Sequence, residues 1–239
     1  RSKLMACMCL KTMHIMHHVN ARQLVFNTAF SEAQLFSRLN AKIFDVIDRM
    51  RAKGIQVLEF AASQKARESV VTKLLAKRET LATHLFDKLR FRVVLGSKDD
   101  LVPALLYLLK NLVPFNYVVP GQSRNGLVSA KEISACLGLT EEAILEFWRS
   151  HEGNWALGPT PPNEFSGRSF QCVNFVAEIP LRIDDVAPEY APAIAFAQTE
   201  IQLVDEKTHL ANNEGENAHD LYKERQRRQV RERLQGLAD

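Results

Sequence analysis

The segment Ala193–Asp205 places a carboxylate in the middle of a strand, and this constrains the fold more than any other feature of the sequence. In this segment, AIAFAQTEIQLVD, small or apolar residues alternate with larger or polar ones at the period of two that is typical of a half-buried β-strand. Glu200 lies on the polar side of this pattern. Burying a carboxylate that has no hydrogen-bond or ion-pair partner costs on the order of several kcal/mol. The sequence therefore predicts that Glu200 meets a cation, a metal ion or a reacting group.

A second predicted strand, residues 87–95, begins with Asp87. Its apolar residues alternate with Arg90 and Arg92. If the two strands are neighbours in one sheet, Asp87 and Glu200 can share a divalent cation such as Mg²⁺, and basic side chains can face phosphates across it. In the alternative interpretation, the two carboxylates form ordinary salt bridges with Arg90 and Arg92, and the network is purely structural.

Composition places the chain among globular proteins. Its 239 residues fit one large domain or one domain with appendages. Hydrophobic residues make up 46% and charged residues 25%, which are ordinary values for a globular protein. The net charge of +3 is too small to indicate a nucleic-acid partner by itself. The chain begins abruptly, as a fragment of a longer protein would.

The N-terminal segment lacks the features of a secretory signal, and no apolar run reaches the roughly 20 residues of a membrane-spanning helix. The four cysteines are scattered, so we expect a reduced, cytoplasmic protein. The spacing of the N-terminal cysteines and histidines matches no standard zinc site. The N-terminal methionines instead predict the buried face of a helix; they are Met5, Met8, Met13 and Met16.

Helices and strands alternate along the chain. Ser31 and Gln34 form a capping-box pattern that starts a helix ending at Gly54. The other predicted elements are a strand at 56–63, a helix at 67–77, a strand at 87–95, a helix from Asp99 that Pro114 ends, a strand at 115–119, a loop at 120–126, helices within 129–150, strands at 169–183 and 193–205, and helices from 206 onward, interrupted at 212–217. This order predicts an α+β fold, a mixed β-sheet of about five strands flanked by helices, with N- and C-terminal helices.

Four blocks of residues carry a pattern that is specific to one known family. In chain order they are Lys65, Ser69 and Lys73; Asp87 and Arg92; Phe115, Tyr117, Pro120, Arg124, Asn125 and Gly126; and Glu200, Gln202, His209, His219, Tyr222 and Lys223. Together, over residues 60–225, these blocks resemble the synthetase domain of the RelA/SpoT family. In the first block Ser63 replaces a family arginine, and Arg67 lies close enough to substitute for it.

The resemblance implies a nucleotidyltransferase-like fold and an ATP-dependent pyrophosphokinase. Such an enzyme transfers pyrophosphate from ATP to the 3′ hydroxyl of GDP or GTP and forms the alarmone (p)ppGpp of the stringent response. Mg²⁺ is the implied cofactor, held by Asp87, with Glu200 completing the metal shell or acting as general base. The residues implied for ATP are Lys65, Arg67, Ser69, Lys73 and Arg92. The residues implied for a purine nucleotide acceptor are Tyr117, Arg124, Gln202, His219 and Lys223.

The expected domain boundaries follow from the same resemblance. Residues 1–55 form an N-terminal helical segment, and residues 56–225 form the synthetase-like domain, with an insertion at about 129–165. Residues 226–239 form the basic end of a C-terminal helix.

The chain departs from the family at the element that binds the acceptor base. The family carries Gly-Tyr-x-Ser-x-His, whose tyrosine stacks on guanine, but here Leu127 occupies the tyrosine position. An alternative alignment at 166–171 keeps only the serine. Since stacking contributes about 1 to 3 kcal/mol per base, we expect weak guanine selectivity unless Phe165, Phe170 or Tyr117 supplies the ring.

Two alternatives to nucleotide pyrophosphorylation stay open. One is transfer to tRNA, RNA or another acceptor, and the other is a catalytically silent relative that binds nucleotide. The C-terminal run KERQRRQVRER carries arginines at three-residue spacing, which usually marks a solvated helix face. RNA or tRNA binding is the alternative interpretation of this run. No sequence feature indicates a membrane partner or fixes the oligomeric state.

Overall fold

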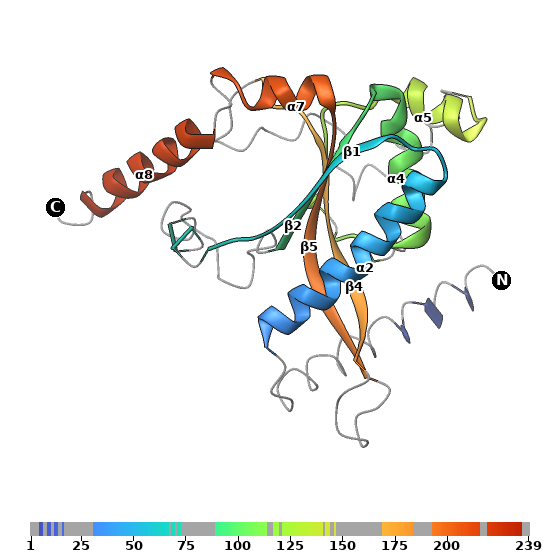
Figure 1. Cartoon of the computed structure of the whole chain (residues 1–239), viewed down its shortest axis with the longest axis horizontal. Coiled ribbons are helices and arrows are strands. Elements are labelled where there is room, and N and C mark those ends of the chain that lie inside the picture. Colours follow the sequence, from blue (N-terminus) through green and yellow to red (C-terminus); the bar gives the residue numbers. More distant parts are fainter. Residues whose placement is uncertain are drawn as a thin grey trace.

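The computed structural model describes residues 31–66, 89–113, 121–140, 169–183, 193–215 and 219–235, with the shorter pieces 5–6, 9–10, 12–13, 16, 68–69, 71–72, 117–119, 142–143 and 146. These residues build one five-stranded mixed sheet with helices packed around it (Figure 1). The predicted α+β architecture is confirmed. Within the described ranges, no helix is both long and apolar enough to cross a membrane.

The strands are β1 Val57–Gln64, β2 Leu89–Leu95, β3 Arg124–Asn125, β4 Val173–Ile183 and β5 Ala193–Asp205. The helices are α2 Glu32–Ala52, the short 3-10 helix η2 Lys98–Asp100, α4 Leu101–Asn111, α5 Ala130–Leu137, α7 Glu206–Asn212 and α8 His219–Gln235. The predicted strands at 56–63 and 193–205 and the helix from Ser31 therefore form close to where the sequence placed them.

The strand order is β1-β2-β5-β4-β3, and β2 and β5 run parallel while the other pairs are antiparallel. The parallel pairing sets Arg90 opposite Glu200 and Arg92 opposite Gln202. On the other side of β5, Asn174 of β4 is opposite Gln202. Because directly paired residues share a face of the sheet, the register gathers polar side chains from three neighbouring strands on one face.

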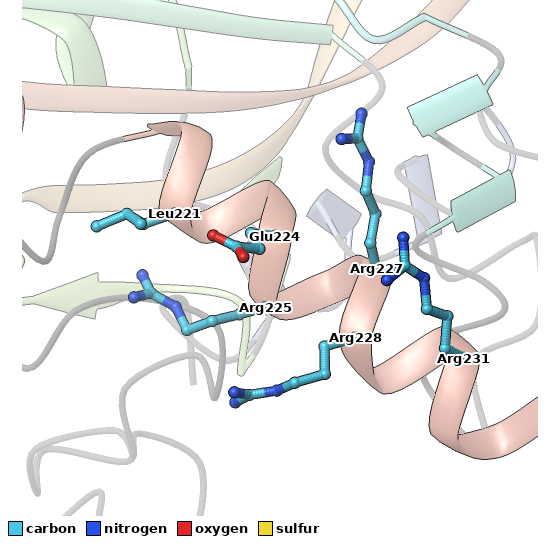
Figure 2. A pocket seen from close by; sticks show the side chains of 6 residues that line it. All are labelled: Leu221, Glu224, Arg225, Arg227, Arg228 and Arg231. Carbon is cyan, nitrogen blue, oxygen red and sulfur yellow. The ribbon is translucent and has the colours of Figure 1, made fainter.

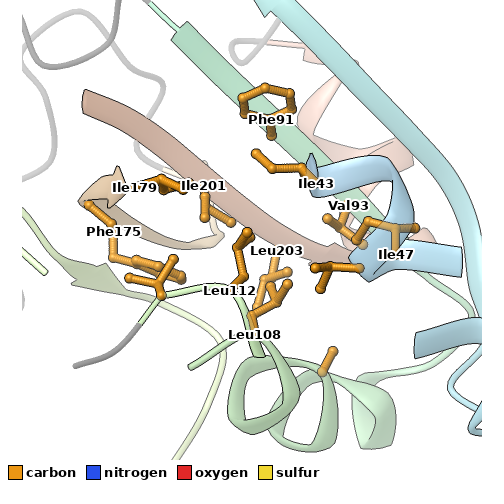
Figure 3. Packing of buried hydrophobic residues seen from close by; sticks show 14 of the residues in the cluster. Ile43, Ile47, Phe91, Val93, Leu108, Leu112, Phe175, Ile179, Ile201 and Leu203 are labelled. Atoms are coloured by element: carbon orange, nitrogen blue, oxygen red, sulfur yellow. The ribbon is translucent and has the colours of Figure 1, made fainter. Parts of the chain in front are cut away.

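The opposite face of the sheet is apolar and packs against α2 and α4. Figure 3 shows side chains of these two helices meeting Phe91, Ile201 and Leu203 of the central strands. All three strand residues are at most 1% exposed. Burying one such side chain contributes about 1.5 to 3 kcal/mol, so this layer supplies the main apolar stabilisation and fixes which sheet face is left for polar groups.

Local capping interactions define the helix ends. At α2, the Ser31 hydroxyl accepts from the backbone N–H of Gln34, and the Gln34 side chain bonds the Ser31 backbone in return. Ser129 and Glu132 form the same arrangement at α5. Gly138 ends α5 with a φ of 65°, a left-handed conformation that glycine adopts without steric cost.

The structure differs from the predictions around residue 120. Of the predicted strand at 115–119, residues 115 and 116 lie outside the described residues, and residues 117–119 make a single bridge, Val118 to Ala177, while Val119 donates to the Val176 carbonyl. Prolines at positions 114 and 120 remove backbone donors on both sides, which limits strand pairing. The predicted loop contains β3, a two-residue strand that pairs with β4. Helix α4 also ends at Asn111, before the proline expected to stop it.

The structure also corrects the prediction that the N-terminal methionines form the buried face of a helix. Residues 5–6, 9–10, 12–13 and 16 are helical, but Met5, Met13 and Met16 are 65%, 53% and 58% exposed. The periodicity of the sequence specified a helix face but not a neighbour that would cover it.

Candidate functional site

The candidate site lies on the face of the sheet that turns away from α2 and α4. We call it the polar face; its side chains are Arg90, Arg92, Asn174, Glu200 and Gln202. They come from β2 and from the consecutive strands β4 and β5, and Arg90 of β2 is 110 positions before Glu200 of β5. The strand register alone brings them together, because each of the five lies directly beside another across a strand pair.

Glu200 is the centre of a connected hydrogen-bond network. Its Oε2 accepts from Arg90 Nε at 2.7 Å, and its Oε1 accepts from Asn174 Nδ2 and Gln202 Nε2, both at 2.9 Å. The residue is 6% exposed. Burial by itself raises the pKa of Glu200, but the charge of Arg90 and the hydrogen bonds from Asn174, Gln202 and Arg90 lower the pKa below its ordinary value.

Arg92 extends this network by one residue. Its Nε and Nη2 both donate to Gln202 Oε1, at 3.2 and 3.1 Å. Burial lowers the pKa of Arg92, and the charge of Arg90 lowers it further, but a guanidinium stays protonated at any working pH. Gln202 thus orients Arg92 on one side and contacts Glu200 on the other.

Arg124 and Cys172 complete the surroundings of the polar face. Arg124 in β3 is paired with Asn174 in the backbone register, and Cys172 directly precedes β4. Burial raises the pKa of the Cys172 thiol to about 11, and Glu200 also raises it, while Arg92, Arg90 and Arg124 oppose the change. The charges of three arginines therefore act on the Cys172 thiol, together with the charge of the buried carboxylate of Glu200.

The structure brings together four of the residues predicted for the site: Glu200, Gln202, Arg92 and Arg124. Lys65 directly follows β1 and is half-buried. Because Ser63 of β1 is opposite Arg90, Lys65 lies at the edge of the sheet where β2 begins. Ser69 lies in a helical piece beyond it.

Other predicted residues are placed elsewhere or lie outside the described part of the chain. Asp87, Arg67 and Lys73 lie outside the described residues, so their roles stay predictions. His219 and Lys223 belong to α8, which extends away from the sheet (Figure 1). Tyr117 packs its ring on Phe196, with 5.5 Å between centroids, four residues before Glu200 along β5. His209 of α7 has its Nε2 4.0 Å from an oxygen of Glu59.

The alternative interpretation of Glu200 as a salt-bridge partner is confirmed for Arg90. Arg92 instead bonds an amide. Among the described residues, no group of three His, Cys, Asp or Glu side chains is placed to hold a metal ion. Glu200 alone does not fit Mg²⁺, because Oε1 already accepts two hydrogen bonds and Oε2 faces a guanidinium.

No sequence feature predicted Asn174 or Cys172 as a site residue. Asn174 Oδ1 is buried and accepts no hydrogen bond, although Nδ2 of the same amide donates to Glu200. A hydrogen-bond donor on a ligand would satisfy this oxygen. The register between β4 and β5 would have identified Asn174, but register depends on which strands pair in the folded sheet.

The structure describes three of the residues that were considered for the acceptor base. Leu127 is 9% exposed and belongs to the apolar core, so it presents no surface for a base. The ring of Tyr117 is packed on Phe196. Phe170 is half-buried three residues before β4 begins, and it is the remaining aromatic candidate among the described residues.

No family model matches the sequence, and no curated protein sequence matches it. Among solved structures, the fold is similar to small alarmone synthetase 1 from Bacillus subtilis bound to its product pppGpp, with a TM-score of 0.48 and 12% identity over 85% of this chain and 87% of that chain. It is also similar to small alarmone synthetase 2 from Bacillus subtilis, with a TM-score of 0.45 and 12% identity over 87% and 96% of the two chains. A GTP pyrophosphokinase family protein from Streptococcus pneumoniae gives a TM-score of 0.43 and 15% identity over 85% and 84%. A similarity at this level concerns only the backbone fold. The chemistry of the site therefore depends on the residues of this protein.

Proposed function

We propose that the polar face binds ATP and transfers its pyrophosphate to the 3′ hydroxyl of a purine nucleotide. The observation that carries the proposal is the pair Arg90 and Arg92, held side by side on one face of the sheet by Glu200 and Gln202. Guanidinium groups fixed in this way are suited to phosphate oxygens, because the side chains are already ordered before the ligand arrives.

The charge balance of the site supports phosphate binding. Arg90, Arg92, Arg124 and the buried carboxylate of Glu200 all act on the Cys172 thiol, and these four charged residues carry a net charge of about +2, which the exposed Glu59 near Arg92 reduces in part. Lys65, at the adjacent end of β1, adds a further positive charge at the same edge of the sheet. Phosphoryl transfer is catalysed mainly by positioning and by electrostatic stabilisation, and a set of fixed cations supplies both.

In the proposed reaction, the acceptor's 3′ oxygen attacks the β-phosphorus of ATP. The bond between this phosphorus and the oxygen that links it to the α-phosphate breaks, so the pyrophosphoryl group moves to the acceptor and AMP leaves. The hydroxyl proton passes to Glu200, the carboxylate at the centre of the network. Asp87 is the proposed ligand of Mg²⁺, which would neutralise phosphate charge when bound.

The hydrogen bonds of Glu200 limit its strength as a base. Its pKa is lowered by Arg90, Asn174 and Gln202, so it is ionised at neutral pH but holds a proton weakly. Glu200 therefore contributes mainly by orienting Arg90 and the acceptor hydroxyl, and proton transfer adds less.

The test is transfer of label from γ-labelled ATP with Mg²⁺ to GDP, GTP, ADP or AMP in turn. We expect labelled product from the wild type and none from Asp87→Asn. A Lys65→Ala, Arg67→Ala double variant is expected to lose ATP affinity, and unchanged affinity would assign that block to an ordinary surface. The exposed pair Arg49 and Lys53, far from the polar face in the fold, is the control for loss of two charges.

A second candidate is a nucleotide-binding protein without catalysis. The full set of hydrogen bonds on Glu200 favours this alternative, since a carboxylate that is already paired has less capacity to act on a substrate. ATP binding without label on any acceptor would select it over the enzyme.

A further inference from the structure

The Oδ1 atom of Asn174 is an acceptor on the polar face that the hydrogen bonds of the described residues leave unused. This oxygen is buried, while Nδ2 of the same amide donates to Glu200 Oε1 at 2.9 Å. The contact with a carboxylate fixes which end of the amide is oxygen, because the reverse orientation would set two acceptors against each other. A buried acceptor without a donor is unfavourable, so a ligand that supplies a donor here gains affinity.

Glu200, the neighbour of Asn174, can accept one further hydrogen bond. An ionised carboxylate offers about four acceptor positions, shared between its two oxygens. Asn174 and Gln202 both donate to Oε1, and Arg90 donates to Oε2. The remaining position is therefore on Oε2. The polar face thus presents two neighbouring acceptor positions that are still open, one on Asn174 Oδ1 and one on Glu200 Oε2.

These open positions define what a ligand must carry. Arg90, Arg92 and Arg124 supply only hydrogen-bond donors, which suit phosphate oxygens. The two open acceptors instead require two donors close together on the ligand. The 2′ and 3′ hydroxyls of a ribose are such a pair, because they are bound to neighbouring carbons of one ring. A 2′-deoxyribose carries only one of them, so the arrangement can separate ribonucleotides from deoxyribonucleotides.

We propose that Asn174 Oδ1 accepts a hydrogen bond from the 2′ hydroxyl of the acceptor nucleotide, while the 3′ hydroxyl donates to Glu200 Oε2. This assignment rests on the proposed function, in which the 3′ hydroxyl is the group that reacts beside Glu200. Asn174 is then the residue that selects ribose. It holds the sugar by the hydroxyl that does not react, and it thereby directs the reacting hydroxyl to the carboxylate.

A ligand reaches the Asn174 oxygen only when a side chain moves, because the atom is enclosed although the residue as a whole is half-buried. Arg124 is exposed and lies directly opposite Asn174 in the register of β3 and β4. An exposed side chain changes rotamer within nanoseconds. Arg124 can therefore turn toward a phosphate of the ligand and open the path to the oxygen.

The experiment measures the binding of GDP and ADP, and of their 2′-deoxy and 3′-deoxy analogues, to the full chain by isothermal titration calorimetry. Mg²⁺ and saturating α,β-methylene ATP are present, so that the donor position is filled and no transfer occurs. We expect the 2′-deoxy analogue to bind about tenfold more weakly than the ribonucleotide, the effect of one hydrogen bond. This comparison uses the wild type and does not depend on the folding of a variant. Equal affinity would overturn the ribose contact.

The variant Asn174→Leu removes the amide at similar volume. We expect it to bind the ribonucleotide about tenfold more weakly and the 2′-deoxy analogue almost as before, so that the two affinities become equal. Discrimination against the 3′-deoxy analogue should remain, because Glu200 is still present. Circular dichroism checks the fold. A 2′-deoxy effect that persists in this variant would exclude Asn174 as its cause.

Gln202→Leu is the matched control, because Gln202 is the other amide that donates to Glu200 Oε1. Its loss should weaken the binding of both nucleotides by the same factor and keep the tenfold ratio between them, since Asn174 Oδ1 is untouched. Disappearance of the ratio in Gln202→Leu would show that the state of Glu200, and not the Asn174 oxygen, distinguishes the two sugars.

A second control tests where the nucleotide binds. Figure 2 shows Arg227 and Arg231 on one flank of α8, where they line a hollow, and guanidinium groups attract the phosphates of any nucleotide. The double variant Arg227→Gln, Arg231→Gln should keep both the affinity and the ratio. Loss of binding in this variant would place the nucleotide on α8 and overturn the assignment.

The outcomes separate this inference from the proposed function. Binding without discrimination against the 2′-deoxy analogue overturns the inference alone, whereas discrimination without label transfer supports the ribose contact in a protein that lacks catalysis. Absence of binding by every nucleotide would contradict both. If Asn174→Leu instead abolishes a preference for GDP over IDP, which lacks the exocyclic amino group, the oxygen contacts the base and the ribose contact is wrong.

Discussion

Arg90 Nε lies 2.7 Å from Glu200 Oε2 and joins strands β2 and β5 across 110 positions of sequence. The Glu200 side chain is 8% exposed and that of Arg90 35%, so one partner is buried while the other reaches the surface. This asymmetry means that loss of Arg90 leaves a buried charge, whereas loss of Glu200 leaves a cation that water can reach.

The first prediction follows from this asymmetry. We expect Arg90→Met to lower the free energy of unfolding by about 3 kcal/mol, because it strands a buried carboxylate. Glu200→Gln is expected to cost less, about 2 kcal/mol, because the amide keeps part of the hydrogen bonding. Urea denaturation of both variants measures the two values. The variant with both changes should lose less stability than the sum of the two single losses. A loss equal to that sum would show that the ion pair contributes nothing.

The second prediction concerns stability at low pH. The folded pKa of Glu200 lies below the ordinary value of 4.5, so its ionised form stabilises the fold above that value. This stabilisation is lost as the pH falls through the lowered folded pKa. The stability difference between wild type and Glu200→Gln should therefore be constant above about pH 5.5 and shrink below pH 4.5.

Glu132 is a second carboxylate whose protonation lowers stability in acid, and its contribution must be separated from that of Glu200. Hydrogen bonds from the Ser129 backbone and hydroxyl lower the pKa of Glu132 to about 2, so the wild type loses this interaction as well in acid. The difference curve for Glu200→Gln excludes that contribution, because both proteins retain Glu132. A difference that grows as the pH falls would contradict the assigned direction of the Glu200 pKa.

The third prediction concerns the cysteines. The Cys172 thiol is half-buried with a pKa of about 11, so very little of it is thiolate at pH 8. Cys136 and Cys9 are exposed and should react with iodoacetamide much faster. Mass spectrometry of peptides after timed alkylation measures each site, and denaturation in urea should bring Cys172 to the rate of the others. Rapid native alkylation of Cys172 would mean that the arginines around it dominate over burial.

The fourth prediction rests on the proposed function. If Phe170 stacks on the acceptor base, Phe170→Ala should raise the acceptor KM by about tenfold or more, because a stacked base contributes about 1 to 3 kcal/mol. ATP affinity should not change, and Phe170→Tyr should restore the KM. Steady-state kinetics with varied acceptor measure both effects. An unchanged KM in the alanine variant would exclude Phe170 as the platform.

Local features of the sequence were enough to define most elements of this fold. Alternation placed Glu200 on the polar side of a strand, and the pair Ser31–Gln34 forms the predicted capping box. Such signals depend on residues a few positions apart, and their physical causes act within one strand or one helix turn. The described part of the predicted strand at 115–119 makes only one bridge, because strand pairing needs a partner with matching donors, which the segment itself does not specify.

The partner of Glu200 was decided by tertiary structure. The sequence was compatible with a cation, a metal ion or a reacting group, and the parallel register of β2 and β5 selected Arg90. The same register brought Asn174 to the carboxylate, while packing buried Leu127 and left Met13 in solvent. Hydrophobic periodicity determines which side of an element is apolar. Only the packing of distant segments determines what each side meets, because that choice depends on the free energy of the whole sheet and its covering helices.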